Sequence, residues 1–283
     1  MYQHPSPPGS DNYLLTYLYK HCLITWLPSG ELCTTLLSQI LVTVRSFEEK
    51  LEMNLAGKKA FVVGGTSGIG LAAAARLTTD GAEVTISGRS KNAHSVANQH
   101  GFANGVQLDV TDERSVDVNL TRQRYDILVV SAGISPSTMP KGWGRHAQRR
   151  LLMEVNHLGA MACIEACTPQ MVEAGYGRVI FVGSAAGLER YKTYGPYGAS
   201  KAALHQDGRV AALDLSGTGV TVNGVCPGFV NTPMTTDIPD EVMAGMMPIG
   251  RVLEDHEVAD AIAFYCGESA AGISGNLMRL GGV

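Results

Sequence analysis

From Ala60 onward, short apolar runs alternate along the chain with longer, alanine-rich stretches. The short runs are rich in β-branched residues and lack the alternation of a half-exposed strand, so we expect strands buried on both faces. The predicted strands are 59–63, 83–87, 105–108, 127–130, 178–182, 221–225 and 277–279. The predicted helices between them are 69–80, 92–100, 112–122, 148–173, 197–215, 240–246 and 255–265. Because this alternation implies right-handed βαβ units, we predict an α/β fold of Rossmann type, with a doubly wound parallel sheet and helices on both faces.

The pattern changes at Met53, and residues 1–52 look unlike the remainder. They begin rich in Pro and Ser, and their apolar stretches are interrupted before reaching the roughly 20 residues of a membrane span. The first 12 residues contain no Lys or Arg, which argues against a secretory signal. We predict that residues 1–52 are an N-terminal extension without chemistry and that residues 53–283 form one catalytic domain. A membrane-surface or organelle-targeting segment is the alternative for 1–52.

Composition excludes some partners. The 283 residues carry a net charge of −4 with scattered Lys and Arg, which gives no electrostatic footprint for nucleic acid. The six cysteines form no Cys-x-x-Cys pair, and we interpret them as reduced thiols of a cytoplasmic protein. We expect no nucleic-acid, membrane or metal partner.

A glycine-rich turn follows the first predicted strand and precedes an alanine-rich helix. Glycines in this place allow a tight turn and let backbone N–H groups approach a pyrophosphate at the helix N-terminus. Strand, turn and helix together predict a dinucleotide site. Its candidate residues in the turn are Gly64, Thr66, Ser67, Gly68, Ile69 and Gly70.

The end of the second predicted strand indicates which dinucleotide is bound. An NAD-binding chain presents a carboxylate to the ribose about 20 residues after the turn. Here residues 86–90 contain no carboxylate but include Arg89, whose planar fork suits a phosphate. We therefore predict a preference for NADP(H) over NAD(H).

Tyr197 and Lys201 lie four positions apart in a predicted helix and so share one face. A free phenol has a pKa of about 10 and needs its anion stabilised to exchange protons near neutrality. An ammonium about 4 Å away supplies an interaction of roughly the right size. The pair is a candidate general acid–base, although such spacing is common on solvated helices.

With these pieces in place, residues 53–283 resemble the compact, single-domain branch of the short-chain dehydrogenase/reductase family. Residues 63–70 resemble its glycine-rich loop, and Tyr197 and Lys201 its Tyr-x-x-x-Lys. Asn156 and Ser184 match its helix asparagine and catalytic serine. Further cofactor residues implied by the matching segments are Asp109, Val110, Ser131, Ala132, Gly133, Pro227, Gly228, Val230 and Thr232.

Two positions depart from the family pattern. Val63 replaces the usual threonine of the glycine-rich loop, and Ser131 replaces the usual asparagine after the fourth strand. The family residues brace the backbone near the cofactor, so these departures affect local rigidity more than chemistry.

The resemblance implies hydride transfer between a nicotinamide and a carbonyl carbon, with no metal. Tyr197 would donate the proton to the carbonyl oxygen, and Ser184 would hydrogen-bond the same oxygen. Lys201 would lower the pKa of Tyr197 and bind the nicotinamide ribose, while Asn156 would hold a water that links Lys201 to solvent. Tyr197 and Lys201 thus count as both catalytic and cofactor-binding residues.

The substrate is less defined. Loops 134–145, 185–194 and 232–250 are rich in methionine and aromatic residues, which predicts an apolar pocket for a ketone or secondary alcohol. Arg145, Arg149 and Arg150 leave open a β-ketoacyl or polyketide reductase acting on a carrier-bound substrate. A catalytically silent cofactor-binding protein and a nucleotide-sugar epimerase are further alternatives. The resemblance also implies a homodimer or homotetramer.

Overall fold

The computed structural model describes residues 54–139, 142 and 144–282. The fold described below is that of the unit Met53–Val283. The prediction for residues 1–52 therefore lies outside the described residues.

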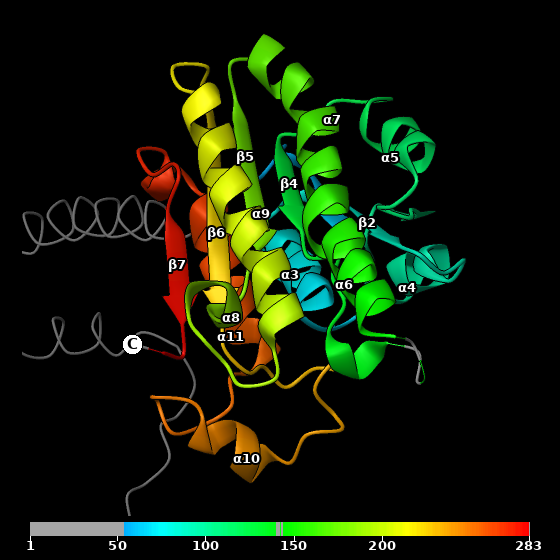
Figure 1. Ribbon diagram of the computed structural model, residues 1–283. Coiled ribbons are helices and arrows are strands. Elements are labelled where there is room, and N and C mark those ends of the chain that lie inside the picture. The colour runs from blue at the N-terminus through cyan, green and yellow to red at the C-terminus, as the bar shows by residue number, and fades with distance from the viewer. Residues whose placement is uncertain (1–53, 140–141, 143, 283) are drawn as a thin grey trace, which may run out of the picture. The chain divides into compact units, whose positions relative to one another are not determined.

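The described chain is built on a seven-stranded parallel sheet with the order β3-β2-β1-β4-β5-β6-β7 (Figure 1). The strands are β1 (Lys59–Val63), β2 (Glu83–Gly88), β3 (Asn104–Gln107), β4 (Ile127–Val130), β5 (Gly177–Val182), β6 (Val220–Pro227) and β7 (Leu277–Leu280). The order reverses between β1 and β4, and in such sheets the crevice at the carboxyl ends of these strands is where ligands bind.

Helices cover both faces of the sheet (Figure 1). The α-helices and the π-helical turn η2 are α3 (Gly68–Thr79), α4 (Ala93–His100), α5 (Glu113–Leu120), α6 (Arg145–Met153), η2 (Glu154–Leu158), α7 (Gly159–Glu173), α8 (Ala185–Leu188), α9 (Gly195–Asp214), α10 (Asp240–Gly245) and α11 (Asp255–Cys266). Short 3-10 turns, η1 (Pro136–Thr138) and η3 (Glu268–Ala270), complete the list.

Successive residues of the central strands belong to different halves of the core. In β1, Val62 packs in the cluster that includes α3 and α11, whereas Phe61 packs in the cluster that includes α5, α7 and α9. Both side chains are fully buried. Two-sided burial explains why these strands are apolar at every position, and it confirms the doubly wound fold.

The predicted bounds are close to those observed, with one main exception. The single helix expected over 148–173 is instead α6, the π-helical turn η2 and α7 in succession. A π turn adds a residue within a helix without breaking it, so the apolar pattern alone does not reveal it. The short elements η1, α8 and η3 were not predicted.

Among the described residues, no helix has the length and apolar character needed to cross a membrane. The same part of the chain contains no group of three or more His, Cys, Asp or Glu side chains placed to hold a metal ion.

The contact between α9 and β5 depends on one glycine. A Cβ added at Gly208 would lie 2.3 Å from Cε1 of Phe181, which is buried in the strand. We expect Gly208→Ala to lower the free energy of unfolding by about 1–3 kcal/mol through overpacking. Gly245→Ala in α10 is the control, since nothing lies within 4 Å of its Cβ position. Urea unfolding measures both, and equal effects would contradict the packing argument.

Candidate active site

A cleft of about 350 Å³ lies where the sheet order reverses, beside the predicted glycine turn. The turn needs its glycines: Gly64 has φ +78°, and a Cβ there would lie 2.7 Å from the backbone N of Ala132. A Cβ at Gly70 would lie 2.2 Å from the carbonyl oxygen of Gly64. The turn leads directly into the N-terminus of α3, whose free N–H groups favour an anion. This cradle fits the pyrophosphate of a dinucleotide.

Most of the predicted cofactor residues line this cleft. They are Gly64, Thr66, Ser67, Gly68, Ile69, Arg89, Asp109, Val110, Ser131, Ala132, Gly133 and Thr232. Gly70 lines neither this cleft nor the adjoining cavity and instead shapes the turn from within. The remaining five line the adjoining cavity: Pro227, Gly228, Val230, Tyr197 and Lys201.

Arg89 lies at the rim of the cleft, just after β2. Its side chain is exposed, and its neighbours in the lining are Thr66 and Ser90. Thr66 packs against Gly88, where a Cβ would lie 2.7 Å from its Cγ2. Asp109 is held on the facing loop, where its Oδ1 accepts bonds from Thr111 N at 3.0 Å and Thr111 Oγ1 at 2.7 Å.

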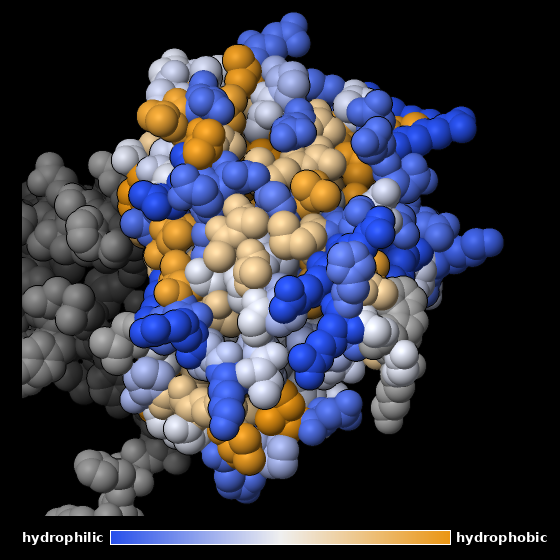
Figure 2. Space-filling model, in the orientation of Figure 1, coloured by the Kyte–Doolittle hydropathy of each residue, from blue (hydrophilic) through white to orange (hydrophobic). Residues whose placement is uncertain are grey.

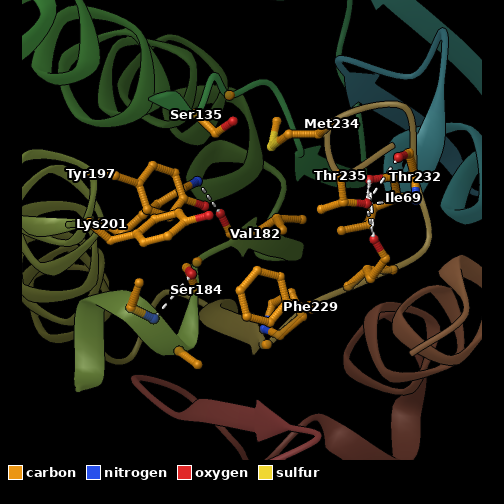
Figure 3. A pocket seen from close by; sticks show the side chains of 18 of the residues that line it. Ile69, Ser135, Val182, Ser184, Tyr197, Lys201, Phe229, Thr232, Met234 and Thr235 are labelled. Carbon is orange, nitrogen blue, oxygen red and sulfur yellow. Dashed lines mark hydrogen bonds between the residues drawn. The ribbon is translucent and has the colours of Figure 1, made fainter. Parts of the chain in front are cut away.

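The adjoining cavity of about 130 Å³ is lined by three of the four predicted catalytic side chains, and Asn156 is not in its lining (Figure 3). Ser184 follows β5 and caps α8, with its Oγ accepting a bond from Ala186 N at 3.2 Å. Tyr197 and Lys201 project from the first turns of α9 toward Ser184 and the end of β5. The structure therefore brings Ser184, Tyr197 and Lys201 together at one wall of the cavity.

Burial dominates the electrostatics of this group. It raises the pKa of Tyr197, and the hydrogen bond with Ser184 opposes the rise. It lowers the pKa of Lys201 to about 8. The sequence argument expected Lys201 to lower the Tyr197 pKa. The structure gives a raised pKa for Tyr197 instead, because the loss of hydration at the phenol outweighs the stabilisation by Ser184.

Lys201 directs its ammonium at the strand. The side chain is 4% exposed, and Nζ donates a hydrogen bond to the carbonyl oxygen of Val182 at 2.8 Å. The ammonium is thus fixed at the end of β5, beside the gap left by Gly133, where a Cβ would lie 3.5 Å from Nζ.

Asn156 lies in the π-helical turn η2 and is fully buried. Its Nδ2 donates to Ile134 O at 2.9 Å and to Ser200 Oγ at 3.1 Å, and its Oδ1 accepts from Ile134 N at 2.8 Å. The side chain therefore joins the loop after β4 to α9. A Cβ at Gly133 would also lie 3.3 Å from Asn156 Oδ1, so this oxygen and Lys201 Nζ border the same gap.

The rest of the cavity wall combines apolar and aromatic side chains with the hydroxyl groups of Ser131, Ser135, Ser137, Thr232 and Thr235. The Tyr194 ring packs edge-to-face against Tyr197 and Phe229, with centroids 6.1 and 6.4 Å apart. Among the described residues of the lining, Lys201 is the one with a charged side chain. Other apolar or aromatic side chains in the wall are Ile69, Ile134, Val182, Tyr191, Val230, Met234 and Ile238.

The sequence left open whether Met243 and Met247 line the pocket or pack a helix against the body, and neither lines it. Met243 and Met247 are 2% and 5% exposed and pack α10 and the following loop against the body. Met247 Sδ accepts a bond from Phe229 N at 3.2 Å, which holds one wall of the cavity from behind.

One residue near the site was missed from the sequence. His205 is buried one helical turn beyond Lys201, and its Nε2 accepts a hydrogen bond from Ser184 N at 3.2 Å. The signal was present as a further step of four residues after Tyr197 and Lys201.

Comparison with known proteins agrees with this geometry. The family model for short chain dehydrogenases matches residues 58–242. The chain belongs to this family. A cis-4-hydroxycyclohexanecarboxylate dehydrogenase from Sinomonas cyclohexanicum is 34% identical over 239 residues, which cover 80% of this chain and 96% of that protein. The 3-oxoacyl-(acyl-carrier-protein) reductase FabG of Escherichia coli is 32% identical over 240 residues, which cover 81% and 98%.

A solved structure of an actinorhodin polyketide ketoreductase with NADPH has a TM-score of 0.72 at 26% identity, covering 80% of this chain and 96% of that one. The chain is thus an NAD(P)-dependent oxidoreductase that acts on CH–OH or C=O groups.

The buried ammonium of Lys201 makes stability depend on pH. Its pKa is about 8 in the folded state against an ordinary 10.5, so between these values the unfolded chain binds the additional proton. Stability should therefore rise with pH across this range, by about 3 kcal/mol in total. Lys201→Met removes the titrating group, so its stability should lack that rise. Urea unfolding from about pH 8 to about pH 10 gives the difference between the two proteins, and parallel curves would contradict the buried-charge argument.

Proposed function

We propose that the protein interconverts an uncharged, largely apolar ketone and its secondary alcohol with NADP(H), using Tyr197 as general acid and base. One observation carries this proposal: Ser184, Tyr197 and Lys201 converge on an apolar cavity that adjoins the dinucleotide cleft.

Each catalytic side chain has its own role toward the transferred proton or the ketone oxygen. When bound, the nicotinamide ring supplies or accepts the hydride. Tyr197 donates a proton to the ketone oxygen, and the Ser184 hydroxyl hydrogen-bonds that oxygen as negative charge develops there. The Lys201 ammonium holds the nicotinamide ribose and favours the phenolate that remains. Because the Tyr197 pKa is raised in the protein alone, the tyrosine retains its proton until the reaction demands it.

Asn156 completes the route for the proton. Its Oδ1 uses one lone pair on Ile134 N, and the other is available toward the gap at Gly133 that Lys201 Nζ also borders. A water in this gap would bond both groups and replenish the proton.

The charge at the cleft rim supports NADP(H) over NAD(H). Arg89 supplies a cation where an NAD-binding chain presents a carboxylate, and Thr66 and Ser90 lie beside it. The named relatives are consistent with this, since the polyketide ketoreductase structure includes NADPH.

The cavity wall supports an apolar substrate without a carboxylate. In the part of the wall that the structure describes, Lys201 is the one cation, and that group is already engaged with Val182 and the proposed ribose contact. The aromatic faces of Tyr191, Tyr194 and Phe229 suit a cyclic or aromatic body.

A carrier-bound β-ketoacyl thioester is a second candidate. The FabG relative supports it, and Arg145, Arg149 and Arg150 are exposed at the start of α6, where a phosphopantetheine or acidic carrier would find cations. The enzyme would then be a β-ketoacyl or polyketide-type ketoreductase.

Self-association is also proposed. The last residue of η2 and the outer faces of α7 and α9 expose Leu158, Val172, Val210 and Leu213, and Figure 2 shows hydrophobic residues over this side of the molecule. A homodimer or homotetramer would cover them.

Purified protein should oxidise NADPH in the presence of cyclic and aromatic ketones, and Tyr197→Phe should lower kcat at least about 100-fold because it removes the acid while keeping the ring. NADPH absorbance measures the rate. The panel includes an acetoacetyl thioester, and a much higher kcat/KM for it would favour the carrier-bound candidate. Near-normal turnover by Tyr197→Phe, or no turnover of any ketone, would reject the proposal.

Arg89→Ala should weaken NADPH binding by about tenfold or more, since it removes a charge-assisted contact with the 2′-phosphate. NADH binding should change by less than about twofold. Fluorescence titration of both nucleotides measures this, with Arg114→Ala in α5 as a control at a solvated helix start. Equal loss of both nucleotides would rule out the phosphate contact.

A further inference from the structure

Three side chains on one ridge of α9 face the end of β5. Tyr197, Lys201 and His205 follow one another at intervals of four residues, so they lie on the same side of the helix. Tyr197 lies close to Ser184 in the cavity wall (Figure 3), and Lys201 donates to Val182 O at 2.8 Å. His205 continues the series, because its Nε2 accepts the backbone N–H of Ser184 at 3.2 Å.

The neighbouring backbone leaves room for the His205 ring at two glycines. A Cβ at Gly183 would lie 2.3 Å from its Nε2, and a Cβ at Gly187 would lie 2.6 Å from its Cε1. The first glycine immediately precedes Ser184, and the second belongs to α8, which Ser184 caps. The two glycines therefore leave space for the His205 imidazole on both sides of Ser184.

The bond from the Ser184 amide requires one tautomer of the ring. Nε2 accepts the N–H of Ser184, so the proton belongs on Nδ1, which is buried and has no hydrogen-bond partner among the described residues. Cys226 Sγ lies 3.3 Å from the same Nε2, and burial raises the pKa of that thiol to about 12, so it stays protonated. Burial and the nearby charge of Lys201 lower the pKa of His205 to about 4, which keeps the ring neutral near pH 7.

We propose that His205 is a positioning residue: its Nε2 holds the amide of Ser184 and thereby aims the Ser184 hydroxyl at the substrate oxygen. The inference rests on the proposed function, in which Ser184 hydrogen-bonds that oxygen. His205 does not line the cavity, so its effect on the substrate is indirect, and its bond to the Ser184 amide supplies the route.

Two substitutions separate the acceptor from the bulk of the ring. The amide of His205→Gln reaches the position of Nε2, whereas the shorter side chain of His205→Asn reaches only the position of Nδ1. We expect His205→Asn to lower kcat for ketone reduction about tenfold, with the KM for NADPH unchanged, and His205→Gln to stay within about threefold of the parent. The tenfold loss corresponds to about 1.4 kcal/mol. His256→Asn, at an exposed position of α11, is the matched control and should leave kcat unchanged.

A double-mutant cycle with Ser184→Ala tests the route of the effect. If His205 acts through Ser184, His205→Asn should cost nothing further once the hydroxyl is removed. Additive losses in kcat would overturn the proposal. So would a change in the pH profile of kcat between His205→Gln and the parent above about pH 5.5, because it would show that the imidazole itself transfers protons.

A measurement on the unmodified protein covers the case in which a variant does not fold. The ¹⁵N chemical shifts of His205 should show a neutral ring with the proton on Nδ1 at pH 7, and a proton on Nε2 would overturn the inference. This readout does not require turnover. Failure of ketone reduction by the parent protein would instead count against the proposed function, so the two failures are distinguishable.

Discussion

The burial of one ammonium constrains this whole region. Lys201 is almost fully removed from water, and a charge in such a place needs a fixed partner. Val182 O is that partner, at the last residue of β5. The strand end therefore cannot move relative to α9 without leaving the ammonium unpaired. Because Ser184 follows two residues after Val182, the same contact also restricts its position.

The fold was largely predictable because its signals are local. Strands buried on both faces are apolar at every position, and the alternation with helices defines the parallel sheet. The glycine turn and the spacing of Tyr197 and Lys201 likewise combine local sequence with known geometry. Residues such as Arg89 and Asp109 meet at one cleft because parallel strands place their carboxyl ends at one edge.

The features that were not predictable depend on tertiary contacts. The sequence contains His205, but its role follows from the close approach of Ser184 N and from the space left by Gly183 and Gly187. The direction of the Tyr197 pKa was wrong from the sequence for a related reason. A pairwise charge argument omits the loss of hydration, which only the packed environment of the phenol reveals.

The π-helical turn at Glu154–Leu158 has a consequence for how related chains should be aligned. One extra residue rotates everything before it by about 100° relative to a regular helix. The turn that presents Asn156 to Ile134 therefore also decides which way the Arg145, Arg149 and Arg150 side of α6 faces. A one-residue deletion there would restore regular helix geometry. It would also rotate α6, so that its charged side chains would face another direction. Gaps placed by sequence alone in this segment would compare residues that point in different directions.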